Sequence, residues 1–102
     1  MAHTVFVKQE AVDDAIEAYE YYEKKEPGLG ERFIEALAKR YSDLSLHPTH
    51  YGFIAEDPLN NLRDVRIDKF PYVVVFELTA AEVFIYAIHN TRKNPLRKIR
   101  KK

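Results

Sequence analysis

The sequence of 102 residues contains no cysteine, so neither a disulfide framework nor a thiolate metal site is expected. A lack of cysteine is compatible with a reducing compartment. No apolar run reaches the roughly 20 residues that a membrane-spanning helix requires. The start of the chain does not join basic residues to an apolar stretch, so no signal peptide is expected. These absences predict a cytoplasmic protein without membrane partners, and the length predicts a single domain over residues 1–102.

The chain also has no net charge, but its charged residues are unevenly distributed. Residues 1–60 carry six basic and twelve acidic side chains, whereas residues 61–102 carry ten basic and four acidic ones. The last eleven residues contain seven Lys or Arg and no acid. This asymmetry indicates an anionic partner for one end of the molecule. A solvated basic tail over residues 96–102 is the alternative interpretation.

Two stretches, residues 10–26 and residues 29–46, have the apolar periodicity of amphipathic helices. The first stripe comprises Ala11, Ala15, Ala18 and Tyr22, and the second comprises Phe33, Leu37, Arg40 and Leu44. Pro27-Gly28 between them is a turn signal, and Pro48 ends the second helix. Because the link is short, the helices should be antiparallel neighbours whose apolar stripes need a further layer to cover them.

Residues 3–8 and three runs between Arg63 and Arg97 are short and rich in Val, Ile, Phe and Tyr, which predicts strands. In the first of the three runs Val65 and Ile67 alternate with charged residues, so one face of that strand should be exposed to solvent. The other two runs are nearly all apolar, as in the middle of a sheet. The order β-α-α-β-β-β predicts an α+β fold in which a helical hairpin packs on a four-stranded, mainly antiparallel sheet. The sheet face without helices is a candidate binding surface, and Arg63 and Arg66 are expected on it.

Polar and basic groups follow the last predicted strand, where His89, Arg92 and Lys93 occur. Any chemistry or anion binding is expected at this end of the sheet. His47 and His50 are one turn apart, but neither His3 nor any other residue supplies an evident third ligand. No metal site and no cofactor are therefore expected.

Four stretches together resemble the RelE/ParE superfamily of toxins from type II toxin–antitoxin pairs. They are residues 10–19 with Tyr22, residues 27–33, Arg63 with residues 70–76, and residues 89–95. The phrase Phe70-Pro71-Tyr72 and the ending from His89 to Pro95 are more similar to the ParE, or plasmid stabilisation, branch. The resemblance covers nearly the whole chain.

The resemblance implies one of two activities. RelE-like members cleave mRNA in the ribosomal A site, ParE-like members block DNA gyrase, and both are neutralised by a cognate antitoxin that wraps the toxin. A toxin fold that retains only an interaction role is a third reading. Both a homodimer and a toxin–antitoxin hetero-oligomer are compatible with the sequence, which does not specify the oligomeric state.

The resemblance also assigns the candidate site residues. RelE-like enzymes usually place an Arg after the aromatic residue that opens the central strand, where this chain has Val73, and a Tyr in the region that here reads Arg97-Lys98-Ile99. Two expected catalytic positions are therefore changed, which favours the gyrase inhibitor. If the protein is a nuclease, Arg92, His89 and Lys69 are the expected catalytic residues, with the cations stabilising the phosphate and His89 as the base. The residues expected to bind the target or the antitoxin are Arg63, Arg66, Tyr72, Lys93 and Arg97.

Overall fold

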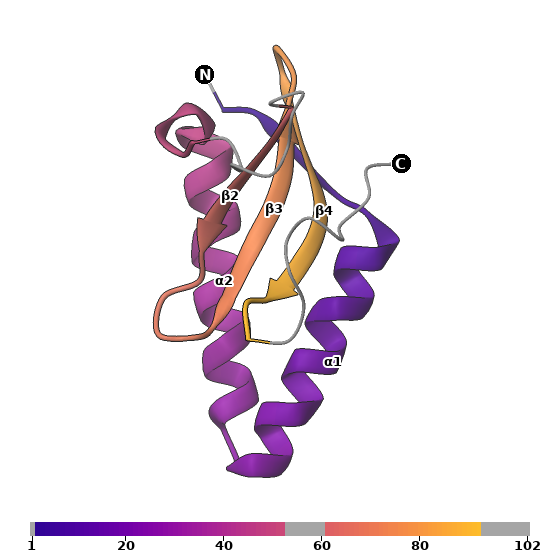
Figure 1. The fold of residues 1–102 in the computed structure, drawn as a ribbon. Helices are drawn as coiled ribbons and strands as arrows, with labels where there is room; N and C mark the ends of the chain where they lie inside the picture. Colours follow the sequence, from indigo (N-terminus) through magenta and orange to yellow (C-terminus); the bar gives the residue numbers. More distant parts are fainter. Residues whose placement is uncertain (1, 53–60, 93–102) are drawn as a thin grey trace.

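The computed structural model describes residues 2–52 and 61–92, in which two helices and a four-stranded sheet form an α+β fold. The elements in chain order are β1 (Thr4–Val7), α1 (Gln9–Lys25), α2 (Leu29–Leu46), the short 3-10 helix η1 (Pro48–His50), β2 (Leu62–Arg66), β3 (Tyr72–Leu78) and β4 (Glu82–Asn90). Figure 1 shows the two helices as a hairpin behind the strands. The predicted element order and fold class are confirmed.

The strands lie in the order β1-β4-β3-β2. β2, β3 and β4 form an antiparallel meander, and β1 pairs with β4 in the parallel direction. Parallel neighbours need a long connection, and here it comprises both helices and the first two strands of the meander. The sheet is therefore mainly antiparallel, with β1 and β2 as its two edges.

A bulge in β4 explains why this strand lacks an alternating pattern. Val75 pairs with Ala87 but Phe76 pairs with Ile85, so Tyr86 is an extra residue in β4. One extra residue reverses the faces of everything that follows it. Ile85 and Ile88, which strict alternation would place on opposite faces, are therefore both buried, at 0% and 3% exposure.

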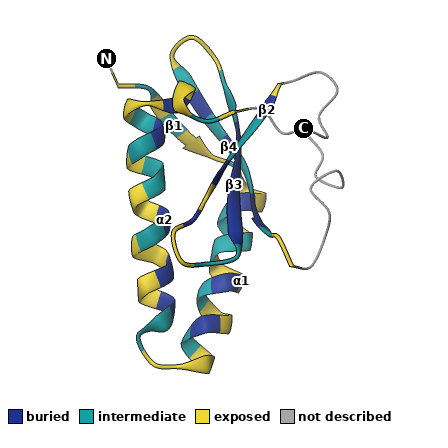
Figure 2. Ribbon diagram, turned by 60° about the vertical axis from the view of Figure 1, so that its left-hand side comes forward, coloured by how far each residue is buried: buried dark blue, intermediate teal, exposed yellow. Residues whose placement is uncertain are grey.

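The main core lies between the helices and one face of the sheet (Figure 2). It contains Ala11, Ala18, Tyr22, Phe33, Leu37, Leu44, Val65, Ile67, Tyr72, Val74, Phe76, Val83, Ile85 and Ile88. Both predicted helical stripes are buried there except Ala15 and Arg40, which are half-buried. Arg40 instead donates from Nε to the carbonyl oxygen of Arg66 at 2.7 Å, and this bond ties α2 to the edge strand β2.

The sheet face without helices is less open than the sequence predicts. Leu62, Val73 and Val75 form a second apolar cluster on it and are 8%, 5% and 0% exposed. Tyr86 and Ala87 pack against this cluster from β4. Exposed side chains on this face occur at both edges: Phe6 of β1 is 47% exposed, and Arg66 of β2, opposite Val73, is exposed on this face as predicted.

Glu23 joins the two helices across the turn. Its carboxylate accepts the main-chain N–H groups of Gly28 and Gly30, each at 3.0 Å. The residue that precedes α2 is Gly28, which has no side chain to cap the free N–H groups of the first turn. A side chain from α1 therefore performs the capping that Ser or Asp usually performs at the start of a helix.

Candidate functional site

The end of β4 lies beside the start of β3, and this corner holds Arg92 in place. Thr91 donates to the carbonyl oxygen of Pro71 from its main-chain N–H at 2.9 Å and from Oγ1 at 3.1 Å. The side chain of Asn90 accepts the Arg92 N–H at Oδ1 (2.9 Å) and donates from Nδ2 to the Tyr72 hydroxyl (3.4 Å). The main chain at Arg92 is thus fixed to the sheet while its side chain is exposed.

Tyrosines of the core surround this corner. Burial raises the pKa of Tyr22, with neighbouring tyrosines adding to the rise, whereas the charges of Arg92 and Lys25 lower that pKa. Burial also raises the pKa of Tyr72; its bond with Asn90 opposes the rise, and Glu17 on α1 adds to it. Arg92 therefore lies next to neutral phenol groups. Arg92 can attract an anion at this corner, and among the described residues these tyrosines supply no proton acceptor near pH 7.

His89 is placed away from this corner's surface. It lies opposite Val73 in the β3–β4 ladder and is only 9% exposed. Its Nε2 is buried and has no hydrogen-bond partner among the described residues. Among the described residues, no hydrogen bond connects His89 to Lys69 or Arg92. The three candidate catalytic residues are therefore not joined into one hydrogen-bonded site.

Lys69 and Arg66 are both exposed near the same end of the sheet. Lys69 lies in the turn between β2 and β3 with a φ of 70°, the left-handed region that non-glycine residues seldom adopt. Because Tyr72 pairs with Asn90, this turn and Arg92 flank one end of the β3–β4 pair. Three exposed cations, Arg66, Lys69 and Arg92, therefore lie near the end of the sheet where anion binding is expected.

One of the expected binding residues, Arg63, lies on the other face of the sheet, and a second, Tyr72, is buried. Arg63 was expected on the open face, but it pairs with Phe76 and has the same phase as the buried Val65, so it belongs to the helix-covered face. Its guanidinium donates to the carbonyl oxygen of Tyr51 at 2.7 Å. Tyr72 is 7% exposed and packs in the aromatic core, so only its hydroxyl group reaches the corner. Lys93 and Arg97 lie outside the described residues.

The sequence did not reveal Asp14, whose carboxylate connects α1 to β4. Its Oδ2 accepts the main-chain N–H of Ile88 at 3.0 Å. β1 ends at Val7, opposite Ile85, so Asp14 bonds to β4 just beyond the reach of β1. Burial raises the pKa of Tyr41 on α2 to about 12, and the charge of Asp14 adds to the rise. No local pattern predicts a contact between residues so far apart in the sequence.

We expect Asp14→Ala to lower the free energy of unfolding by about 1–3 kcal/mol, because the buried N–H of Ile88 would lose its acceptor. Asp14→Asn should be far milder, since the amide oxygen can still accept that bond. Burial raises the pKa of Asp14 above its ordinary value of 3.8, against the opposing effect of the Ile88 bond. The folded state therefore holds this proton more tightly, and the contribution of Asp14 to stability falls as pH rises from 3.8 through the raised pKa.

Urea unfolding of both variants and the wild type between pH 3 and pH 8 measures this effect. Relative to the wild type, Asp14→Asn should gain stability as the pH rises through that window. A constant difference across the pH range would show that Asp14 does not titrate differently in the folded protein.

Two findings concern possible metal ligands and long apolar helices in the part of the chain that the structure describes. Within residues 2–52 and 61–92, no three His, Asp or Glu side chains gather closely enough to hold a metal ion. The rings of His47 and His50 stack at 4.8 Å with an angle of 6°. None of the described helices is both long and apolar enough to cross a membrane.

The comparisons with known proteins agree with this architecture. Residues 5–95 match the family described as "ParE toxin of type II toxin-antitoxin system, parDE". No curated protein sequence matches the chain. Among solved structures, "Chromosomal ParDE TA system from P. aeruginosa" superposes with a TM-score of 0.75 at 16% identity, covering 87% of this chain and 96% of that chain. At this level of identity the structural likeness concerns the fold alone.

Proposed function

The chain belongs to the family of ParE toxins of type II toxin–antitoxin systems, and from this premise we propose that it stops growth by binding DNA gyrase. In this proposal the protein acts in the cytoplasm, performs no catalysis of its own, and is neutralised by a cognate antitoxin. The family match supports the toxin class. The identification of DNA gyrase as the target goes beyond the family match and is what the proposal adds.

The buried pair formed by Val73 and His89 is the observation that favours an inhibitor over a nuclease. RelE-like enzymes usually carry an Arg at the position of Val73, which here is 5% exposed and faces His89 across the ladder. This pair supplies neither a cation for the phosphate nor an accessible base for the 2′-hydroxyl. Arg92 and Lys69 alone can bind an anionic group but cannot move the proton that cleavage requires.

The exposed cations at the end of the sheet suit an anionic contact on the target or on the antitoxin. Arg66, Lys69 and Arg92 are all exposed there. A carboxylate bound by Arg takes two parallel N–H···O bonds, which makes such contacts directional as well as strong. We propose an acidic or amphipathic antitoxin segment as the partner, bound as an added strand or as a helix in a groove.

A supercoiling assay with purified gyrase and purified toxin tests the proposal. Added wild-type protein should inhibit supercoiling in proportion to its concentration, and Arg92→Ala should need about tenfold more protein for the same effect, as expected for a lost charged hydrogen bond. Lys39→Ala, which removes an exposed cation from α2, is the matched control and should inhibit like the wild type. Normal supercoiling at high toxin concentration would count against gyrase as the target.

Mapping of mRNA 5′ ends in a translation reaction provides the opposite test. The proposal predicts no new ends when the protein is added. Codon-linked ends that appear only with ribosomes would overturn it and would make Lys69, His89 and Arg92 the residues to mutate. If neither assay shows an effect and overexpression without antitoxin is harmless, the protein retains only an interaction role.

A further inference from the structure

Lys69 occupies a turn position that glycine or asparagine usually fills. The turn runs from Ile67 to Phe70 and is closed by the Phe70 N–H, which donates to the carbonyl oxygen of Ile67 at 3.3 Å. Lys69 is the third residue of this turn and has a φ of 70°, the only positive φ of a non-glycine residue in the part of the chain that the structure describes. Glycine and asparagine are favoured at such a position because most other side chains are strained there.

Both ends of this turn are anchored in the core, so the turn cannot relieve the strain by relaxing. Ile67 and Tyr72 are 1% and 7% exposed. The N–H of Ile67 donates to the carbonyl oxygen of Tyr72 at 2.9 Å, and the N–H of Tyr72 donates to the carbonyl oxygen of Phe70 at 2.8 Å. Residue 69 is therefore held in the left-handed conformation, where lysine makes the fold less stable than glycine would. Residues with strained backbones of this kind gather at ligand-binding sites.

The charge of Lys69 is not used inside the described part of the protein. Among the described residues, the side chains of Lys69, Arg66 and Arg92 form no hydrogen bond and no ion pair. The guanidinium groups of Arg40 and Arg63, by contrast, donate to main-chain carbonyl oxygens. The exposed cations at this end of the sheet are therefore free to bind an anion, whereas the other two stabilise the fold.

Main-chain bonds bring Lys69 and Arg92 to the same corner. Thr91, which precedes Arg92, donates its main-chain N–H to the carbonyl oxygen of Pro71 at 2.9 Å, and Pro71 is two residues from Lys69. The N–H of Arg92 is fixed by Oδ1 of Asn90 at 2.9 Å. Both cations thus project from a backbone that is already ordered, which lowers the entropy lost when a partner binds.

We propose that Lys69 binds a carboxylate of a protein partner together with Arg92, and that the strained turn holds its backbone in position for this contact. This inference rests on the anionic contact of the proposed function, but not on gyrase. Lysine supplies a compact charge and arginine a planar pair of donors, so the two can bind neighbouring carboxylates of one acidic segment. The loss of stability caused by lysine in this turn is then offset by binding.

Two observations favour a protein carboxylate over the phosphates of a nucleic acid. Phe70 and Pro71 directly follow Lys69 and are only half-buried, so apolar surface lies beside the cation. The chain has no net charge, and residues 1–60 carry twelve acidic side chains against six basic ones. Domains that bind nucleic acids are generally basic. An acidic segment with some apolar side chains therefore suits this corner better than a phosphate backbone.

Two variants that remove the charge of Lys69 separate binding from stability. Lys69→Gly removes both the charge and the strain, so it should raise the midpoint temperature of thermal unfolding by about 4 °C. Lys69→Ala removes the charge but keeps a Cβ, and its midpoint should stay within about 2 °C of the wild type. Circular dichroism measures these midpoints. A midpoint of Lys69→Gly at or below that of the wild type would show that lysine does not strain this turn, and would overturn the proposal.

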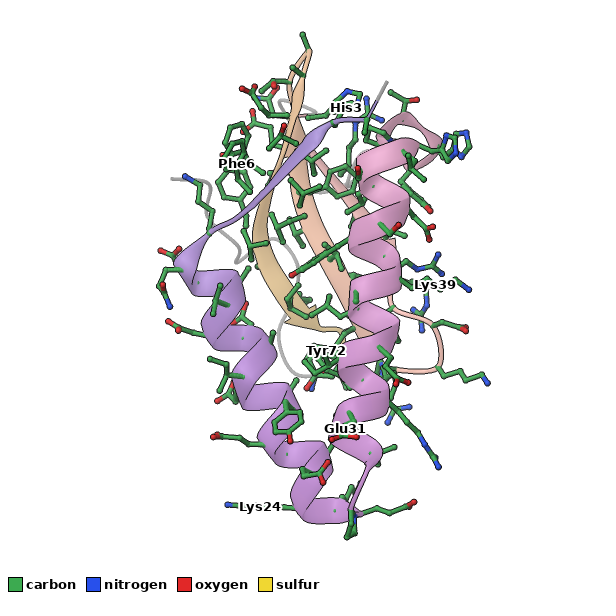
Figure 3. The ribbon with its side chains drawn as sticks, turned by 180° about the vertical axis from the view of Figure 1, so that it is seen from behind. His3, Phe6, Lys24, Glu31, Lys39 and Tyr72 are labelled. Atoms are coloured by element: carbon green, nitrogen blue, oxygen red, sulfur yellow. The ribbon has the colours of Figure 1, made fainter. Side chains whose placement is uncertain are left out.

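Binding of a fluorescently labelled glutamate homopeptide, followed by anisotropy at low salt, is the second readout. The dissociation constant should rise about fivefold for both Lys69→Gly and Lys69→Ala, as for the loss of one exposed ion pair. It should change by less than about twofold for Lys69→Arg, which keeps the charge. Lys24→Ala is the matched control and should bind like the wild type, because Lys24 is exposed beside the turn between α1 and α2, away from the strands (Figure 3).

Equal affinities of Lys69→Gly and the wild type for the peptide would overturn the proposal, as would equal losses in Lys69→Ala and Lys24→Ala. A single-stranded oligonucleotide of the same charge is the second probe, and tighter binding of this probe than of the peptide would assign the corner to a nucleic acid instead. Because the binding assay contains no gyrase, the two proposals can fail separately. Normal supercoiling with peptide binding that depends on Lys69 rejects only the gyrase target, and inhibited supercoiling without that dependence rejects only the carboxylate site.

Discussion

Phe33→Ala should lower the free energy of unfolding by about 3–5 kcal/mol, as the removal of a fully buried aromatic ring generally does. Phe33 is 0% exposed and lies at the centre of an aromatic cluster. Its ring centre is 5.7 Å from that of Tyr22, 5.3 Å from that of Phe70 and 5.2 Å from that of Tyr72. Alanine would lose these edge-to-face contacts and leave a cavity between α1, α2 and β3.

A loss of this size is a large share of the roughly 5–15 kcal/mol that stabilises a domain of this kind. Urea unfolding followed by circular dichroism would measure it. Ile34→Ala, at the next residue of the same helix, is the matched control because Ile34 is 39% exposed. It should cost less than about 1 kcal/mol, since Ala also favours the helix. Similar losses in the two variants would mean that the aromatic cluster is not the centre of the core.

The same cluster also supports the candidate site. Tyr72 contacts Phe33 on one side and accepts a bond from Asn90 on the other, and Asn90 in turn accepts the N–H of Arg92. A partly unfolded cluster would release this chain of contacts. Phe33→Ala should therefore weaken the binding of an anionic partner at temperatures well below its unfolding transition.

The helices could be predicted closely because local signals mark their ends. Pro27-Gly28 and Pro48 bracket α2, and the structure places it at Leu29–Leu46, as the sequence predicts. The apolar spacing that defines both stripes is also local. The strands of the meander follow from composition and short turns, and the antiparallel pairing follows from those turns.

The sheet face predicted for Arg63 was wrong, although the alternating pattern of its strand indicated the correct face. It has the same phase as Val65 and Ile67 in a strand with period two, so it had to share their face. The charge of its side chain suggested the open face instead. In the structure Arg63 lies on the helix-covered face at the start of β2, where its guanidinium donates to the carbonyl oxygen of Tyr51.

The bulge at Tyr86 and the bond from Ile88 to Asp14 could not be predicted. Both depend on how distant segments meet: the bulge on the pairing of β3 with β4, and the bond on the point where β1 ends. Arg92 was predicted at the end of the sheet, because it directly follows the last strand. To predict that His89 is buried opposite Val73, one would need the register of the β3–β4 ladder, and the composition does not define that register.

Gly30→Ala should destabilise the protein by about 2–3 kcal/mol, because a side chain at this position would collide with α1. A Cβ at residue 30 would lie 2.7 Å from the main-chain oxygen of Tyr19, 2.8 Å from Oε1 of Glu23 and 2.9 Å from Cδ1 of the Tyr19 ring. The oxygen of Tyr19 belongs to the backbone of a helix and cannot turn aside. The two helices would have to separate at the point where Glu23 caps α2, so the bonds to Gly28 and Gly30 would be lost as well.

The other glycines allow this steric effect to be separated from the loss of backbone freedom. Among the described residues, no atom lies within 4 Å of a Cβ placed at Gly28 or Gly52. Gly28 has a φ of 91°, so Gly28→Ala should cost about 1–2 kcal/mol from the left-handed conformation alone. Gly52→Ala should be neutral or slightly stabilising, because alanine restricts the unfolded chain without a clash. Thermal unfolding should therefore rank the three variants with Gly30→Ala lowest and Gly52→Ala highest. If Gly30→Ala unfolds like Gly52→Ala, the close approach of α1 and α2 at Gly30 is not what holds the helical hairpin together.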